Sequence, residues 1–200
     1  MAPMTRLFAL LLGTSIAVVC ATPPHRAEAA PAKKKYHFEL TEVKAKSTVK
    51  EDIAKSATPR VESQIKSALD SHPQVGKADG APDPKTKPED YRKFLTSHNL
   101  SGAYYLTVEV TEATEEVVPV EDKKSSQRLV IHVAIHMLAE NIPGRTIGFV
   151  GDGQATVKQE VGMKIRDRDR ESTWDEASKV AVDDALTKIF AQLAIPPRKQ

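Results

Sequence analysis

The chain has 200 residues, with 29 lysines and arginines against 27 aspartates and glutamates, and its formal net charge is +2. A charge balance this even gives no electrostatic argument for binding nucleic acid or an anionic membrane, so we predict neither partner. The single cysteine, Cys20, excludes a disulfide within the chain.

The first 29 residues have the three parts of a secretory signal. Arg6 precedes an apolar stretch at residues 7–19, and small residues end the segment at Ala27 and Ala29. This stretch is too short to span a bilayer. We therefore expect cleavage after Ala29, or after Ala21, and no transmembrane span in the mature chain.

The alternative to a freely exported protein is a lipid anchor at Cys20. Bacterial lipoproteins are cut just before a cysteine that follows a small residue, but Val19 occupies that position here. We favour an exported, periplasmic or extracellular protein without the anchor. Beyond the signal we predict a flexible arm at residues 30–35, one domain at 36–195 and a tail at 196–200.

The predicted domain begins with a strand and a long helix. Residues 36–44 alternate apolar and polar side chains, as a half-buried strand does. Apolar residues then recur at helical spacing over 48–71, and Thr48 with Glu51 forms a capping box at the start. Pro59 either kinks this helix or begins a second one.

A loop, a second helix and a second strand follow. Residues 72–88 are rich in proline, glycine, aspartate and lysine, which indicates an exposed loop around a short edge strand at 74–77. A short helix is expected at 89–98 and a strand at 102–111. Residues 112–127 begin polar and acidic, so we predict a mobile connection there.

Two more strands and a final helix complete the domain. Residues 128–138 alternate so strictly that we predict the central strand, and 146–161 form a third long strand with a bulge or bend at Gly151 and Gly153. After the alternating charges of 166–171, Thr173 and Glu176 form a capping box for a helix with a wide apolar face that runs to residue 193.

This order predicts an α+β fold of two layers. We expect a mixed, largely antiparallel sheet of three to five strands with helices packed on one face, because the wide apolar face of the last helix needs a sheet to cover it. The elements lack the strand-helix alternation of a doubly wound fold.

One stretch resembles a known group of envelope proteins. A short helix ends in Leu100-Ser101-Gly102-Ala103 and leads into the strand 104–108. The order of elements around it, over residues 36–193, is similar to the amino-terminal domain of the translocation protein TolB, the lipoprotein activators of penicillin-binding proteins, and the curli secretion subunit.

The resemblance implies a non-catalytic binding or assembly module in a bacterial envelope. The chain departs from the group in three ways: it has no clear lipobox at Cys20, no propeller domain after the last helix, and no obvious pore-forming hairpins. No functional residue is carried over, and the partner is left open.

His132 and His136 have the spacing of a metal pair on a helix. Their segment is strand-like, however, so the two residues would lie roughly 13 Å apart. Val133 also stands where a zinc protease carries glutamate. We therefore predict no metal site.

Other catalytic patterns are missing or weak. Gly148, Gly151 and Gly153 do not reproduce the spacing of a dinucleotide-binding loop. The mature chain offers no cysteine nucleophile, and we interpret the adjacent carboxylates Glu115 and Glu116 as solvated. We predict no catalytic residue and no cofactor.

Two features are candidates for a contact surface. Tyr104 and Tyr105 put one ring on each face of a strand, so one of them could be exposed. Val117, Val118 and Val120 would be unusual in a solvated loop, and they could extend the hairpin or pair with another chain.

These observations favour an exported, non-enzymatic module that binds another envelope protein through a sheet edge or a protruding hairpin. The alternatives are a hydrolase that uses histidine and carboxylates brought together by the fold, and a homo-oligomeric structural subunit paired through an edge strand. The hydrolase requires His132 or His136 in a cleft beside an acid. The sequence does not give the oligomeric state.

Overall fold

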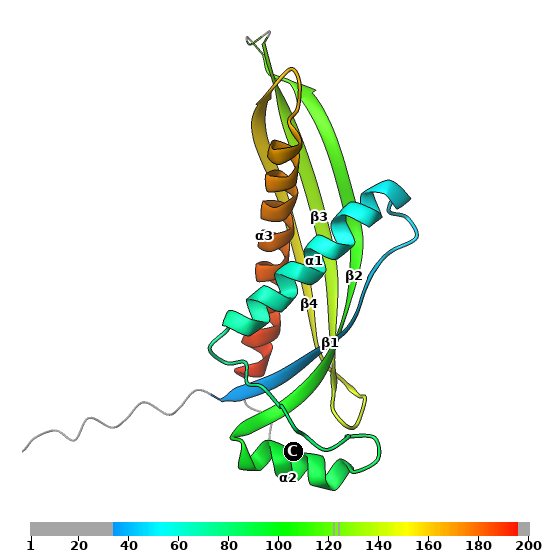
Figure 1. Cartoon of the computed structure of the whole chain (residues 1–200), viewed down its shortest axis with the longest axis vertical. Coiled ribbons are helices and arrows are strands. Elements are labelled where there is room, and N and C mark those ends of the chain that lie inside the picture. The colour runs from blue at the N-terminus through cyan, green and yellow to red at the C-terminus, as the bar shows by residue number, and fades with distance from the viewer. Residues whose placement is uncertain (1–33, 122, 124, 196–200) are drawn as a thin grey trace, which may run out of the picture. The chain divides into compact units, whose positions relative to one another are not determined.

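A four-stranded sheet with the order β1-β2-β3-β4 forms the centre of the protein (Figure 1). The computed structural model describes residues 34–121, 123 and 125–195, so the expected signal segment, Cys20 and the tail at 196–200 lie outside the described residues. The elements are β1 (Lys35–Ala45), α1 (Glu51–Ser71), α2 (Pro88–Ser97), β2 (Leu100–Pro119), β3 (Ser126–Asn141), β4 (Ile147–Gly162) and α3 (Asp167–Leu193).

The predicted fold class is confirmed. Strand β1 runs parallel to β2, whereas β2, β3 and β4 pair antiparallel in sequence order. Helices α1 and α3 cover one face of this mixed sheet (Figure 1). The short edge strand expected at 74–77 is reduced to a single parallel bridge between Tyr36 and Val75.

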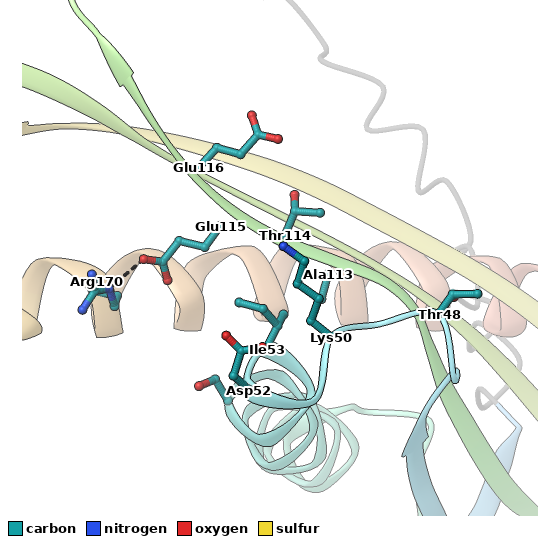
Figure 2. Close-up of a pocket in the computed structure, with 10 residues that line it drawn as sticks. Thr48, Lys50, Asp52, Ile53, Ala113, Thr114, Glu115, Glu116 and Arg170 are labelled. Atoms are coloured by element: carbon teal, nitrogen blue, oxygen red, sulfur yellow. Dashed lines mark hydrogen bonds and ion pairs between the residues drawn. The ribbon is translucent and has the colours of Figure 1, made fainter.

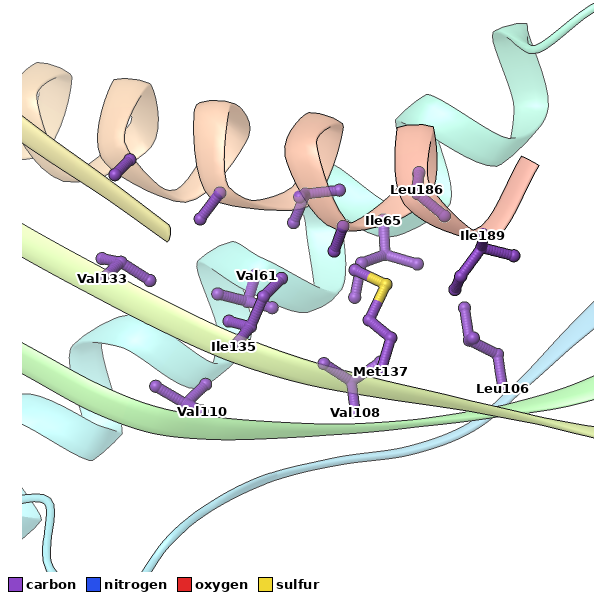
Figure 3. Close-up of a cluster of buried hydrophobic side chains, with 14 of the residues drawn as sticks. Val61, Ile65, Leu106, Val108, Val110, Val133, Ile135, Met137, Leu186 and Ile189 are labelled. Carbon is purple, nitrogen blue, oxygen red and sulfur yellow. The ribbon is translucent and has the colours of Figure 1, made fainter. Parts of the chain in front are cut away.

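The core lies between β3 and the two long helices (Figure 3). The alternating residues that predicted the central strand are at most 2% exposed; they are Leu129, Ile131, Val133, Ile135 and Met137. They pack with Val61 and Ile65 of α1 and with Ile189 of α3 (Figure 3). Each such side chain contributes roughly 1.5–3 kcal/mol by leaving water, so this cluster is the main source of stability.

Neither predicted capping box forms. Helix α1 begins at Glu51 with Lys50 as its N-cap and no side-chain cap hydrogen bond, so Thr48 lies before the helix. Pro59 lies inside α1, which continues through it.

Helix α3 begins at Asp167, earlier than predicted, and Thr173 lies within it. The Thr173 hydroxyl donates to the carbonyl of Asp169 at 2.6 Å instead of capping a helix start. Arg166 donates to the Asp169 carboxylate at 2.7 and 3.0 Å. The alternating charges are spaced to pair along a helix, which explains why a segment expected to be irregular is helical.

Strand β2 is much longer than predicted. The expected mobile connection at 112–127 is strand up to Pro119, which pairs with Gln127 of β3. A register shift between Val110 and Glu112 changes which side chains face the core, so Ala113 faces inward after Val110. The polar residues that suggested a loop therefore lie in a hairpin arm.

Gly151 and Gly153 do not form a bulge, because β3 and β4 pair without a register shift on either side of them. They allow α3 to approach β4 closely. A Cβ atom on Gly151 would lie 2.5 Å from the backbone oxygen of Ala185, and one on Gly153 would overlap the backbone oxygen of Ala181.

Candidate functional site

The outer half of β2 has a strand partner on one side only. Strand β1 ends at Ala45, which pairs with Val110, and the Lys46 amide donates to the Val110 carbonyl at 2.9 Å. From residue 112 to 119, β2 pairs with β3, and no strand of the described chain lies along its other edge. We call residues 112–119 the β2 free edge.

The main-chain groups that point outward from this edge follow from the strand register. In β4 the carbonyls of Val150 and Asp152 and the amide of Gln154 point away from β3, because side chains of α3 bind them. Main-chain groups alternate sides along antiparallel strands. The residue pairs between β4 and β3, and then between β3 and β2, extend this alternation to β2. It places the outward main-chain groups of the β2 free edge at Ala113, Glu115 and Val117.

A groove lies beside the β2 free edge (Figure 2). It has a volume of about 620 Å³ and opens between β2, the start of α1 and the first turns of α3. The lining residues are Thr48, Lys50, Asp52, Ile53, Ser56, Ala113, Thr114, Glu115, Glu116 and Arg170. The contribution of α1 to this groove does not follow from the sequence pattern.

Glu115 forms a fixed part of the groove wall. Its carboxylate accepts hydrogen bonds from Arg170 at 2.8 Å and from the Trp174 indole at 2.9 Å (Figure 2 shows the contact with Arg170). The side chain is 18% exposed, so the expectation that it is solvated is wrong. The spacing of Arg170 and Trp174, four residues apart on one helix face, is the sequence signal that could have indicated a shared acidic partner.

The groove mouth carries uncompensated acidic charge. Glu116 is exposed and forms no ion pair with another described residue, and Glu112 has only the imidazole of His132 at 3.5 Å. Lys50 and Asp52, which both line the groove, offset each other in charge. The outer face of the β2 free edge is therefore negative.

Val117 and Val118 end the β2 free edge as exposed apolar side chains. They are 45% and 42% exposed, and Val120 beyond them is partly buried. Neighbouring residues of a strand point to opposite faces, so each face of this hairpin arm carries one exposed valine. Their role as a contact surface remains a prediction.

The expected exposed aromatic ring is not there, since Tyr104 is 7% and Tyr105 is 9% exposed. Tyr104 stacks on Phe38 in the main core, with ring centroids 5.5 Å apart. Tyr105 belongs to a second apolar cluster with Tyr91 and Leu95 of α2. The prediction failed because α2 covers the second face of β2 at this end of the sheet.

The two histidines lie on the sheet face opposite the core. His132 contacts the Thr156 hydroxyl at 2.9 Å and the Glu112 carboxylate at 3.5 Å, and His136 contacts Asp152 at 2.6 Å. A hollow of about 230 Å³ beside Asp152 has neither imidazole in its lining, so it is not the cleft that a hydrolase would require.

The described residues contain neither a metal-binding cluster nor a membrane-spanning helix. They contain no group of three or more histidine, cysteine, aspartate or glutamate side chains placed to hold a metal ion. None of the helices in the described part of the chain is both long and apolar enough to span a membrane.

No protein-family model and no curated protein matches this chain, and the solved structures that are similar to it are distant. Rare lipoprotein B of Shewanella oneidensis is 13% identical, with a TM-score of 0.38 over 78% of this chain and 96% of that one. A minor lipoprotein of Acinetobacter baumannii is also 13% identical, with a TM-score of 0.38 over 82% and 98%. A Xanthomonas campestris protein reaches 0.43 at 11% identity, over 82% and 91%.

Proposed function

We propose that this protein is an exported, non-catalytic module of a bacterial cell envelope that binds another envelope protein. In this proposal the partner contributes an extended segment, which adds as a strand along the β2 free edge. The observation that carries the proposal is the unpartnered edge at residues 112–119, which has a groove beside it and exposed valines at its end.

Main-chain hydrogen bonding supports a strand as the ligand. An unpaired strand edge presents amide donors and carbonyl acceptors, and an added strand satisfies them while its side chains enter neighbouring pockets. Ala113, Glu115 and Val117 would provide the main-chain groups. Ile53 of α1, which lines the groove, would contact the inward-facing side chains of the added segment.

The charges of the edge indicate the chemistry of the partner. Glu112 and Glu116 lie on the outer face of the β2 free edge, where they lack a lysine or arginine partner among the described residues. Opposite-charge pairs across neighbouring strands are favourable. The added segment would therefore carry lysine or arginine on its outer face, and apolar residues beside Ile53 and Val117.

Export is part of this proposal because of the signal-like residues 1–29. The partner would then be met outside the cytoplasm.

Photo-crosslinking in the native host tests this function. A benzoylphenylalanine placed at position 117 should form an adduct with one partner segment, whereas the same group at the exposed position 179 on α3 should not. Mass spectrometry of the adduct identifies the segment, which is then synthesised and titrated against the purified protein. We expect an extended peptide that carries basic residues.

Two variants at position 117 separate main-chain from side-chain recognition. Val117→Pro removes an outward amide and should weaken binding of the synthesised peptide about tenfold, the loss of roughly one hydrogen bond. Val117→Thr keeps this amide and should bind within a few-fold of the wild type. A peptide that binds the proline variant as tightly as the wild type would refute strand addition at this edge.

A further inference from the structure

The opposite edge of the sheet, along β4, is covered over only part of its length. Gln192 donates to the carbonyl of Val150 at 2.6 Å and Lys188 to that of Asp152 at 2.6 Å, and the Asp184 carboxylate accepts from the amide of Gln154 at 3.3 Å. These α3 side chains occupy the outward main-chain groups of residues 150–154. Strand addition is therefore blocked there.

Beyond residues 150–154, the main-chain groups of residues 156–161 accept or donate no hydrogen bond with a described side chain, whereas the carbonyl of Gly162 is bound by Gln127 at 3.1 Å; we call residues 156–161 the upper β4 edge. The first turns of α3 contact this part of β4 through side chains, Thr173 with Gln159, and reach Glu115 of β2 through Arg170 and Trp174, so they bind none of these main-chain groups. By the alternation along β4, the outward main-chain groups of this edge belong to Thr156, Lys158 and Glu160.

The sequence of the upper β4 edge is complementary to itself. Residues 157–161 read Val-Lys-Gln-Glu-Val. If two copies pair antiparallel about Gln159, Lys158 of each copy faces Glu160 of the other, and Val157 faces Val161. Residues 158 and 160 both point their main-chain groups outward, so this register also forms the main-chain hydrogen bonds.

Two exposed apolar side chains support the same register. Met163 is 65% exposed and Val180 is 46% exposed. The register places Met163 opposite Ala155 of the second copy. Val180 lies one helical turn before Asp184 and on the same face of α3, and Asp184 binds the β4 edge at Gln154. In this register Val180 would therefore lie beside Met163 of the second copy. Pairing would remove both side chains from water.

We propose that two copies of this chain associate through their upper β4 edges, antiparallel about a twofold axis at Gln159, to give one continuous sheet of eight strands. Lys158, which has no ion pair among the described residues, gains Glu160 of the second copy, whose carboxylate also binds Lys123 of its own chain at 2.8 Å. The surface is distinct from the β2 free edge, because β2 and β4 lie on opposite sides of β3.

The β2 free edge does not have this property. Pairing it with itself about Thr114 sets Glu112 against Glu116, and pairing it about Glu115 sets that residue against its own copy. Like charges directly opposite each other are destabilising. The self-complementary edge is therefore on β4.

Charge exchange at positions 158 and 160 tests the dimer. Sedimentation equilibrium over about a hundredfold range of protein concentration should show a monomer-dimer equilibrium for the wild type. Lys158→Glu and Glu160→Lys should each weaken it about tenfold or more, because each single change opposes like charges. Mixing the two single variants, or combining both changes in one chain, should restore the dimer.

Controls separate this association from unfolding and from the proposed function. Glu112→Lys alters the other edge and should leave the dimer unchanged. Circular dichroism at a concentration where the wild type is monomeric should show a folded spectrum for every single variant, including Glu160→Lys, which also loses its ion pair with Lys123 of the same chain. The register is read from Gln159→Cys in a chain with Cys20→Ser, which should form an interchain disulfide on mild oxidation. A wild type that stays monomeric, or single variants that dimerise as well as the wild type, would overturn the proposal and leave binding at the β2 free edge to its own test.

Discussion

The indole of Trp174 donates a hydrogen bond of 2.9 Å to the carboxylate of Glu115, and so joins the last helix to the outer half of β2 across 59 positions of sequence. Trp174 is 1% exposed. A buried indole donor needs an acceptor, and Glu115 is the acceptor that the fold supplies. This contact fixes the wall of the groove beside the β2 free edge.

Removing the Glu115 carboxylate should destabilise the protein. We expect Glu115→Ala to lower the free energy of unfolding by about 1–3 kcal/mol, because the Trp174 indole loses its acceptor. Glu115→Gln keeps an acceptor oxygen and should cost less. Urea denaturation followed by tryptophan fluorescence measures both, since Trp174 is the only tryptophan. Equal losses for the two variants would mean that the charge, and not the acceptor, stabilises the contact.

The two close glycines of β4 should not tolerate a methyl group. Gly153→Ala would force α3 away from the sheet, and we expect a loss of about 1–3 kcal/mol or more, as for other overpacked sites. Gly144→Ala is the matched control, because a Cβ there meets only the Thr146 hydroxyl at 3.9 Å. Thermal unfolding should separate the two variants by several degrees.

The carboxylate of Asp169 makes stability depend on pH in the acid range. Hydrogen bonds from Arg166, with the charge of that guanidinium, hold the pKa of Asp169 below its usual value. Its stabilisation is therefore present above the unfolded-state pKa of about 3.9, and it is lost as the pH falls through the lower folded-state pKa. Asp169→Asn should be less stable than the wild type at neutral pH, and the difference should shrink on acidification.

In the folded protein the tyrosines should ionise at a higher pH than free tyrosine does. Burial raises the pKa of each of the four, that of Tyr91 to about 12. A raised pKa means that stability is full below the unfolded-state value of about 10 and falls as the pH rises through the folded-state values. Absorbance at the phenolate band should show little ionisation at pH 10 in buffer and about half in urea. A full step near pH 10 in buffer would contradict the burial of these rings.

The sequence predicts the parts of this fold that depend on local periodicity. The strict alternation in β3 and the wide apolar face of α3 gave the correct element types, because burial on one side leaves a periodic pattern. The capping box at Thr173 and Glu176 failed for an equally local reason. Arg166 and Asp169 pair within the first turn of α3, so the helix begins before Thr173.

The candidate site was predicted only in part, because its residues are brought together by contacts between distant segments. The sequence identified Val117 and Val118 as unusual for a loop, but the nearby charge of Glu115 suggested a solvated segment. In the structure Arg170 and Trp174 bind the Glu115 carboxylate. The start of α1 gives no sign in the sequence that it lines a groove against β2. Tyr105 was misjudged because the position of α2 does not follow from the pattern of β2.

The close packing of α3 against β4 requires a pattern of small residues that can be recognised in sequences too diverged to align. Two glycines separated by one residue on the strand, Gly151 and Gly153, lie against two alanines one turn apart on the helix, Ala181 and Ala185. The strand carries Gly-x-Gly and the helix Ala-x-x-x-Ala, about thirty residues later. A chain that keeps both spacings, after a strand as strictly alternating as β3, is a candidate for the same helix-on-sheet packing even where overall identity is low.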